Sequence, residues 1–306
     1  MDYILSILQG VVQGLTEFLP VSSSGHLNIF QHFFGITEDN LFFNVMLHVG
    51  TLVSVCAFYH KLIFRLIKAV FSIIKDIFTG KFSFKNMDED RNLVFMLIIG
   101  LLPLFFLFVP IGNDMKVKDL AEVFTGDPKF FIVTGISLLL TSVLLLVGIL
   151  LNRRREALLL LGKAEPKENY GVVDALVVGC VQVVAAILPG LSRSGSTLAA
   201  GQSRGISKQK ALDYTFILAI PSILAAAVLE FFDALSQEGG LQVDFGPVIV
   251  GMITSAVVGY LSIALFKWLL RTDKTYIFVI YASLMGTVIT VISIIELVTG
   301  QIISFV

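Results

Sequence analysis

The chain has 306 residues, of which 56% are hydrophobic and only 15% charged, and its mean hydropathy is +0.89. Such a composition excludes an ordinary soluble domain and predicts a protein that lies in a lipid bilayer. A formal net charge of -1 provides no basic field for nucleic acid, and the two cysteines, Cys56 and Cys180, lie in apolar runs that predict neither a disulfide framework nor a zinc site.

The first apolar stretch, residues 3–30, is interrupted near its middle by the segment EFLPVSSSGH. Residues 1–12 lack a basic region and a small-residue cleavage site, so we expect them to belong to the mature protein. A broken backbone at membrane depth is tolerated only where it is buried in protein or lines a wet cavity. We therefore predict a re-entrant helix-loop-helix hairpin.

The rest of the chain predicts a second hairpin and six membrane spans. The second broken stretch, residues 172–203, contains ILPGLSRSGST. A spanning helix requires about 20 largely apolar residues. Three qualifying windows follow each hairpin: 43–60, 92–111 and 130–151, then 209–232, 247–268 and 276–298. The predicted fold class is an all-α polytopic membrane protein with six full transmembrane spans plus two re-entrant hairpins, in one membrane domain covering residues 1–306.

Lys and Arg residues predict the orientation, because cytoplasmic loops collect positive charge. Neither residues 1–42 nor residues 233–246 contain a Lys or Arg. We therefore expect both termini outside, the first hairpin entering from outside, and the second entering from inside. The basic segments predicted to lie inside are 60–91, 152–168, 204–210 and 267–274.

Two hairpins that enter from opposite sides, each followed by three spans, form an inverted-topology repeat. At an offset of 169, QGLTEFLPVSS (13–23) and QVVAAILPGLS (182–192) share four of eleven residues. The alternative is that any two apolar hairpins share a Leu-Pro pair. We expect repeat halves of approximately 1–160 and 165–306.

Arg193, in the second hairpin, lies outside the basic segments and outside the mixed-charge segment 112–129. A charge at the bilayer centre costs about 2.5 to 3.5 kcal/mol, so this arginine requires an anionic partner or a solvated cavity. Neighbouring glycines allow close backbone approach, and arginine binds phosphate through a bidentate fork. The segment predicts a phosphate cradle; the alternative is a structural arginine paired with a carboxylate across the repeat. The hydroxyls of the cradle belong to Ser192, Ser194, Ser196 and Thr197.

The first hairpin carries complementary chemistry around Glu17 and His26. A buried glutamate near phosphate can hold a divalent cation or accept a proton, and histidine can attack phosphorus or transfer a proton. His48, four residues after Asn44, faces either the substrate or a packing contact, with neither favoured. We interpret His32 and His60 as structural. The hydroxyls between Glu17 and His26 belong to Ser22, Ser23 and Ser24.

QGLTEFLPVSSSGHL and LPGLSRSGSTLAAG resemble the two signature motifs of the undecaprenyl pyrophosphate phosphatase family, also called BacA. The resemblance runs over essentially the whole chain. It implies an enzyme of the bacterial cytoplasmic membrane whose site faces outside and removes the terminal phosphate of undecaprenyl pyrophosphate. That reaction regenerates the carrier for peptidoglycan and other cell-wall polymers. It also implies a divalent cation, Mg²⁺ or Ca²⁺, and bacitracin resistance on overproduction, because bacitracin sequesters the same pyrophosphate.

The resemblance assigns Glu17 as the retained acidic residue and metal ligand, His26 as nucleophile or acid-base group, and Arg193 as the pyrophosphate clamp. Where many members have a second glutamate, this chain has Gln13, so Glu17 carries the acid role alone. The predicted substrate-binding set is Gln13, Ser22, Ser23, Ser24, Ser192, Ser194 and Thr197.

The rival hypothesis is a polyprenyl-phosphate carrier that flips lipid between leaflets, since secondary carriers also build sites from broken helices in inverted repeats. A pure carrier has no use for a nucleophile beside the clamp, which favours the hydrolase. The expected partners are a polyprenyl pyrophosphate and membrane lipids, with a homodimer as an open alternative and no nucleic acid.

Overall fold

A computed structural model describes residues 2–36, 41–84, 87–112, 115–126, 128–165, 167, 169–236 and 244–305. These residues are almost entirely helical, which confirms the all-α prediction. A short antiparallel pair of strands, β1 (Pro110–Gly112) and β2 (Met115–Lys116), lies between two of the helices. A short helix, α6 (Asp119–Gly126), and a single 3₁₀ turn, η3 (Pro128–Phe130), follow the strands.

The described residues include five helices long and apolar enough to cross a bilayer. The first, α5 (Glu89–Leu101), continues into the 3₁₀ helix η2 (Leu102–Phe108). They agree with five of the predicted windows and make the chain a multi-pass membrane protein. The other four are α7 (Phe131–Leu160), α10 (Lys208–Ser236), α11 (Phe245–Arg271) and α12 (Tyr276–Thr299).

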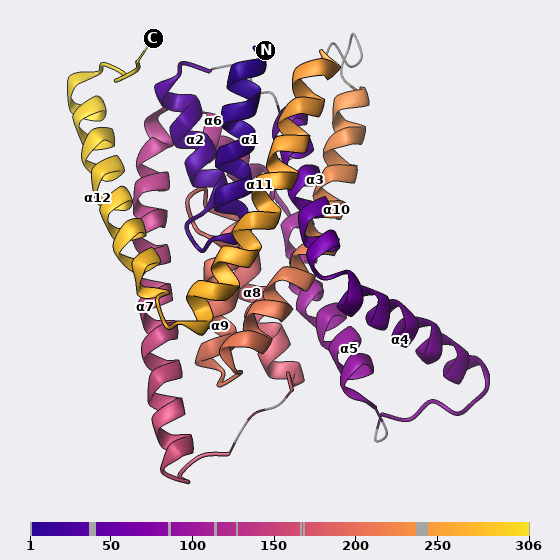
Figure 1. Ribbon diagram of the computed structural model, residues 1–306. Coiled ribbons are helices and arrows are strands. Elements are labelled where there is room, and N and C mark those ends of the chain that lie inside the picture. Colours follow the sequence, from indigo (N-terminus) through magenta and orange to yellow (C-terminus); the bar gives the residue numbers. More distant parts are fainter. Residues whose placement is uncertain are drawn as a thin grey trace.

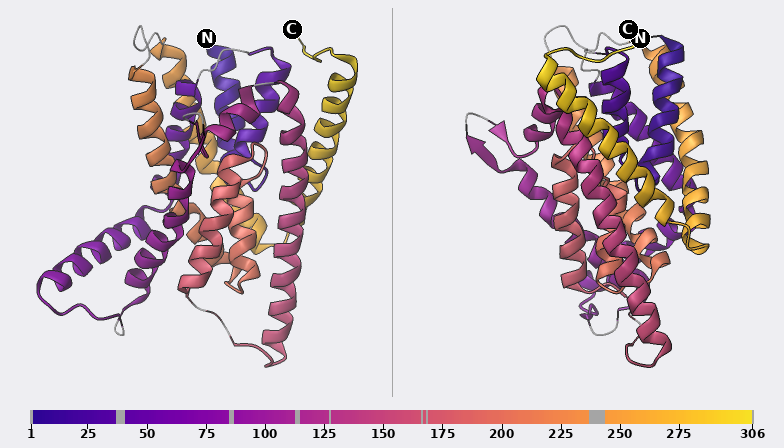
Figure 2. Two further views of the ribbon diagram at one scale, coloured as in Figure 1. Left: turned by 180° about the vertical axis from the view of Figure 1, so that it is seen from behind. Right: turned by 90° about the vertical axis from the view of Figure 1, so that its left-hand side faces the viewer.

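The sixth predicted window, 43–60, corresponds to α3 (Leu41–Phe58), which packs inside the bundle against α10 and α11. It passes the length and hydropathy criteria only together with α4 (His60–Phe78), from which it is separated by a bend of 84°. The number of spans is therefore five, or six when this bent pair counts as one. Figures 1 and 2 show that α4 leaves the bundle and extends sideways from it.

The two broken stretches form two helix pairs of matching length. The first pair is α1 (Tyr3–Phe18, 16 residues) and α2 (Ser23–Phe33, 11 residues). The second is α8 (Val172–Ile187, 16 residues) and α9 (Arg193–Ser203, 11 residues). Figure 1 shows the first pair beginning at the end of the bundle that holds both termini, and the second beginning at the opposite end. The two turns meet near the middle, where the Ser194 hydroxyl donates to the Leu19 carbonyl at 3.2 Å.

Each turn is built by a proline and a serine cap. The residue before a proline avoids the α region, so α1 and α8 end at the Leu-Pro pairs. Ser22 then caps α2 by accepting from the Gly25 N–H at 3.1 Å, and Ser192 caps α9 by accepting from the Gly195 N–H at 3.1 Å. These caps satisfy backbone donors that a helix start leaves without partners.

Small residues let α1 lie close to α11. A Cβ added at Gly10 would lie 2.6 Å from the Gly251 carbonyl oxygen, and one added at Gly14 would lie 2.8 Å from the Ser255 carbonyl oxygen. Membrane helices associate through such small residues spaced four apart, because the backbones can then approach closely. This contact fixes the face of α1 that carries Gln13 and Glu17.

Candidate active site

A buried ion pair joins the two turns. Glu17 lies in the last turn of α1 and Arg193 is the first residue of α9, and Nη2 of the arginine donates to Oε1 of the glutamate. The side chains are 3% and 24% exposed, respectively. A charge taken out of water needs such a partner, because an unpaired one would cost several kcal/mol. The structure thus places the arginine on a carboxylate from the other half of the chain.

The second carboxylate oxygen of Glu17 accepts one hydrogen bond from its own helix, α1, and one from α2. Oε2 accepts from the Gln13 amide at 3.0 Å and from the Ser23 hydroxyl at 2.6 Å. Nε2 of His48 lies 3.6 Å from the same oxygen, beyond a hydrogen bond but within ion-pair range. Donors of this kind stabilise the ionised form of a carboxylate.

Three buried polar atoms around this pair make no hydrogen bond within the described part of the chain: Nη1 of Arg193, Oε1 of Gln13 and Oγ1 of Thr215. Leaving a buried donor or acceptor unsatisfied costs about 1–3 kcal/mol. Glu17, Arg193 and Thr215 also line an apolar cavity of about 10 Å³, room for roughly one water molecule. The pair therefore keeps one guanidinium edge and one amide oxygen available for a ligand.

The serines of the two turns differ in what they bind. Ser23 faces Glu17, whereas Ser22 and Ser192 are the helix caps described above. The hydroxyls of Ser24 and Ser194 each lie 3.3 Å from the capping hydroxyl of their own turn. The caps bring the N-termini of α2 and α9 toward the meeting point, and helix N-termini favour anions.

The two remaining hydroxyls of the second turn lie on α9 itself. The Thr197 hydroxyl donates to the Arg193 carbonyl at 2.8 Å, inside α9. Ser196 is buried, and its hydroxyl makes no hydrogen bond in the part of the chain that the structure describes.

His26 is held by its own turn and by α12. Nδ1 faces the Ser22 carbonyl at 2.7 Å and therefore carries the proton, so in the neutral ring Nε2 accepts from the Tyr281 hydroxyl at 2.6 Å. The two rings are stacked with centroids 5.6 Å apart. No hydrogen bond or ion pair joins His26 to Glu17 or Arg193 among the described residues. Its predicted role as nucleophile or acid-base group stays a prediction.

The structure places the His48 ring beside Glu17, whereas the sequence left its role open between substrate contact and packing. Nδ1 of His48 donates to the Asn44 carbonyl at 2.8 Å, which turns Nε2 toward Glu17. Sequence reasoning missed Tyr281 and Thr215, because each is a single polar residue within an apolar span. By contrast, His32 pairs with Glu296 at 2.9 Å and stacks on Phe131, in keeping with a structural histidine.

The oxygen atoms around the ion pair determine whether the expected divalent cation could be held there. The described residues contain no group of three or more His, Cys, Asp or Glu side chains that could hold a metal ion. One carboxylate, Glu17, and one unpaired amide oxygen, Oε1 of Gln13, lie at the ion pair. Mg²⁺ accepts such a sparse protein set, because it commonly takes its other ligands from phosphate and water. The residues therefore fit a cation that is held mainly by a phosphate ligand.

Comparison with known proteins gives a consistent result. The family model described as "Bacitracin resistance protein BacA" matches residues 6–288. An undecaprenyl-diphosphatase of Alkaliphilus metalliredigens is 38% identical over 292 residues, covering 94% of this chain and 98% of the relative. Undecaprenyl-diphosphatases of Desulfatibacillum aliphaticivorans and Bacteroides fragilis are 35% and 34% identical, and the alignments cover 95% and 96% of this chain and 99% of each relative.

Proposed function

This chain belongs to the BacA family, and we propose that it hydrolyses undecaprenyl pyrophosphate at the ion pair between Glu17 and Arg193. The products are undecaprenyl phosphate and inorganic phosphate, so the enzyme recycles the lipid carrier for peptidoglycan synthesis. The observation that carries the choice of site is the pair itself, one residue from each turn, with Nη1 of the arginine unpaired.

Arg193 serves as the clamp. Its planar guanidinium offers donors along two edges, so one edge stays on Glu17 while Nη1 binds an oxygen of the pyrophosphate. Its positive charge then stabilises the charge that grows on the leaving phosphate, which is the main contribution a protein makes to phosphoryl transfer. The buried surroundings strengthen this interaction because little water screens it.

Glu17 serves as the proton acceptor, and the Ser23 hydroxyl at 2.6 Å is the group it is placed to deprotonate. The serine oxygen attacks the terminal phosphorus, its proton passes to Glu17, and undecaprenyl phosphate leaves. Glu17 gives that proton to the departing undecaprenyl phosphate. Water then attacks the phosphoserine and passes a proton to Glu17, which returns it to the Ser23 oxygen as inorganic phosphate leaves. The alternatives retained from the sequence are attack by His26 and direct attack by water that His26 activates.

A quench experiment separates these routes. Purified protein in detergent receives a prenyl pyrophosphate labelled in its terminal phosphate, and the reaction is stopped with acid. Phosphoserine survives acid and phosphohistidine does not, so labelled protein that is lost in Ser23→Ala and kept in His26→Ala supports the serine route. Acid-stable label in the Ser23→Ala protein contradicts it. Label that is lost in acid but survives an alkaline quench supports attack by His26, and absence of label after both quenches in a competent wild-type reaction favours direct attack by water.

The assignment of the site has a simpler test. Arg193→Ala should lower phosphate release by about 10²–10³-fold, by analogy with removal of one charge-stabilising donor. Glu17→Ala removes the proton acceptor and should lower release by about 10²–10⁴-fold. Arg153→Ala, an exposed arginine at the end of α7, is the matched control and should retain wild-type release. Full activity in either site variant contradicts the assignment.

The expected cation would be held by Glu17 and by Oε1 of Gln13, with the pyrophosphate as its main ligand. When bound it supplies positive charge beside the phosphate oxygens. Titrating Mg²⁺ or Ca²⁺ into chelator-treated protein should restore phosphate release, and undiminished release in chelator contradicts a cation requirement. A homodimer stays a prediction, tested by the mass of the protein in detergent.

The matching hairpins support a fold of six spans and two re-entrant hairpins arranged as an inverted repeat. The helices that enter correspond at an offset of 169, residues 3–18 with 172–187. The helices that return correspond at 170, residues 23–33 with 193–203, so the second turn is one residue longer. Both returning helices begin with the same serine cap, which favours duplication over chance resemblance.

The orientation follows from the basic segments. The ends of α4 and α7 and the turn between α11 and α12 lie away from the termini (Figure 1), and positive charge marks the cytoplasmic face. The termini and the site entrance then lie outside the bacterial cytoplasmic membrane. In cells expressing protein without Cys56 and Cys180, an impermeant maleimide should label Ile302→Cys but not Leu160→Cys; the reverse pattern contradicts this orientation.

The carrier hypothesis finds no support in the comparisons, since the matched relatives are named for hydrolysis. A reconstituted system that translocates lipid without releasing phosphate would revive it.

A further inference from the structure

The bent helix α4 (His60–Phe78) carries three distinct faces. Leu66, Ala69 and Ile73 are buried, because this face packs against α5. A second face is apolar and exposed, with its members spaced three and four residues apart, as along one side of a helix. The large exposed side chains are Phe64, Ile67, Phe71, Ile74, Ile77 and Phe78, of which Phe71 is 67% and Phe78 is 87% exposed.

The third face is basic and borders the apolar one. Lys61, Arg65, Lys68 and Lys75 are all exposed. With Asp76 as the one acidic residue, the helix carries four positive charges and one negative charge, a formal charge of +3. Asp76 is already paired with Arg91 at 2.8 Å.

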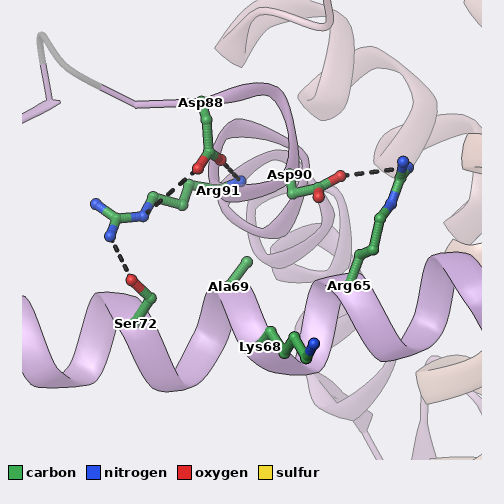
Figure 3. A pocket seen from close by; sticks show the side chains of 7 residues that line it. All are labelled: Arg65, Lys68, Ala69, Ser72, Asp88, Asp90 and Arg91. Carbon is green, nitrogen blue, oxygen red and sulfur yellow. Dashed lines mark hydrogen bonds and ion pairs between the residues drawn. The ribbon is translucent and has the colours of Figure 1, made fainter.

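The basic face keeps most of its charge uncompensated. A cavity of about 210 Å³ lies between α4 and the start of α5. Arg65 lies 3.4 Å from Asp90, and Arg91 donates to the Ser72 hydroxyl; Figure 3 shows both contacts. Lys68 lines the same cavity without a carboxylate partner in the described part of the chain, and its amine lies 4.7 Å from the Phe64 ring centre. Lys61 and Lys75 likewise form no ion pair with any of the residues that the structure describes.

The bend decides what these faces meet. α3 stands within the bundle, and α4 turns from it by 84°. With α3 along the bilayer normal, as in the proposed fold of six spans, this bend sets α4 close to the plane of the membrane. An amphipathic helix in that position buries its apolar face at the boundary between acyl chains and headgroups, while lysines extend to the headgroup level. Unpaired basic residues at that level attract anionic lipids.

We propose that α4 is an interfacial lipid-binding helix that gathers anionic phospholipids on the basic side of the bilayer. Its apolar face inserts beside the acyl chains, and Lys61, Lys68 and Lys75 bind the phosphates of the surrounding headgroups. This surface lies outside the Glu17–Arg193 site, so the proposal does not depend on the hydrolytic assignment.

The insertion is tested by tryptophan fluorescence in reconstituted full-length protein. Trp268, the one tryptophan of the chain, is replaced by phenylalanine, and Phe71→Trp is introduced on the apolar face of α4. Lipids brominated near the headgroup end of the acyl chain should quench this tryptophan more than lipids brominated near the chain terminus. Leu261→Trp on α11 should show the opposite order, and Leu160→Trp, 89% exposed at the end of α7, should be quenched by neither.

The charge preference is tested with the same Phe71→Trp reporter. Brominated phosphatidylglycerol should quench it at least about twofold more than brominated phosphatidylcholine in equal mixtures with unlabelled lipid. Lys61→Gln, Lys68→Gln and Lys75→Gln together should reduce that ratio to about one. The matched control, Arg153→Gln, Arg154→Gln and Lys163→Gln, removes three charges at the same end of the molecule and should leave the ratio unchanged.

Three outcomes overturn the proposal. A reporter shielded from both bromolipids and aqueous iodide means that another protein surface, such as a second copy of the chain, covers the face. A ratio of one in the unaltered helix means that the lysines do not select anionic lipid. An equal loss of the ratio in the control variant assigns the preference to overall charge and not to α4. Phosphate release by each variant, expected at the wild-type rate, verifies that the protein is folded.

Discussion

Replacing Arg193 with methionine should expose how much the protein depends on the pairing of two charges within the membrane. The substitution keeps an apolar side chain of similar length but leaves the Glu17 carboxylate, 3% exposed, with only the amide, hydroxyl and imidazole donors around it. Removing one partner of a buried ion pair costs about 3–5 kcal/mol, because the other charge stays uncompensated. Arg193 is itself 24% exposed, which places the expected cost near the lower bound.

The double variant of Glu17 and Arg193 separates the cost of the stranded charge from the loss of the arginine side chain. Glu17→Gln in the Arg193→Met background removes the stranded charge, so the double variant should recover about 2 kcal/mol or more of the loss, because a neutral pair of similar volume is often as stable as the ions. Unfolding by denaturing detergent, followed by circular dichroism, measures all four proteins. Phosphate release should be lost in every variant although stability returns in the double one.

Two results would refute this reasoning. Additive losses in the double variant would mean that the two side chains do not interact as the structure places them. Recovery of activity along with stability would mean that the pair holds the fold together and takes no part in the reaction.

Three further predictions concern the surroundings of the pair. Gly14→Leu should lower the melting temperature by several degrees, because a Cβ there would lie 2.8 Å from the Ser255 carbonyl oxygen; differential scanning fluorimetry measures it. Tyr281→Phe removes the hydroxyl that donates to Nε2 of His26. If Tyr281 only orients the His26 ring, kcat should fall by about tenfold or less and KM should stay unchanged. Gln13→Glu places a second carboxylate where the amide now donates to Glu17 at 3.0 Å, so half-maximal activity should require less divalent cation.

Each of these has its own control. Val257→Leu on the exposed face of α11 should leave the melting temperature unchanged. Tyr260→Phe, a tyrosine of the neighbouring span, should leave kcat unchanged. An unaltered cation requirement in Gln13→Glu would indicate that the amide oxygen does not face the cation.

The sequence predicts most of the fold because membrane helices are long apolar runs and each break carries a proline. Window 43–60 coincides with α3 and ends beside the bend at Tyr59, so whether it forms a sixth span stays a prediction; what hydropathy did not predict is the 84° turn that sends α4 out of the bundle. The amphipathic pattern of α4, with lysines recurring on one side, was the available signal for a surface helix.

The candidate site, like the fold, could be predicted only in part from the sequence. An intramembrane arginine and glutamate are costly, so their presence alone predicts a pair or a ligand, and the structure joins them. The positions of His48 and Tyr281 depend instead on how α3 and α12 rotate against the hairpins, which no local pattern encodes. The conformation of Ser22 was not predicted either: it lies in the turn with a positive φ of 75°, and its hydroxyl caps α2.

The separation of 176 residues between Glu17 and Arg193 has a consequence for how the protein is made. At a synthesis rate of about 5–20 residues per second, Glu17 emerges roughly 10–35 seconds before its arginine exists. During that interval a carboxylate in the membrane has no cation to neutralise it. In the proposed re-entrant arrangement, the first hairpin would wait near the aqueous boundary, or carry a proton, until the second arrives. A segment that enters and leaves on the same side is suited to such a delay, since its insertion does not have to be completed before the rest of the chain is translocated.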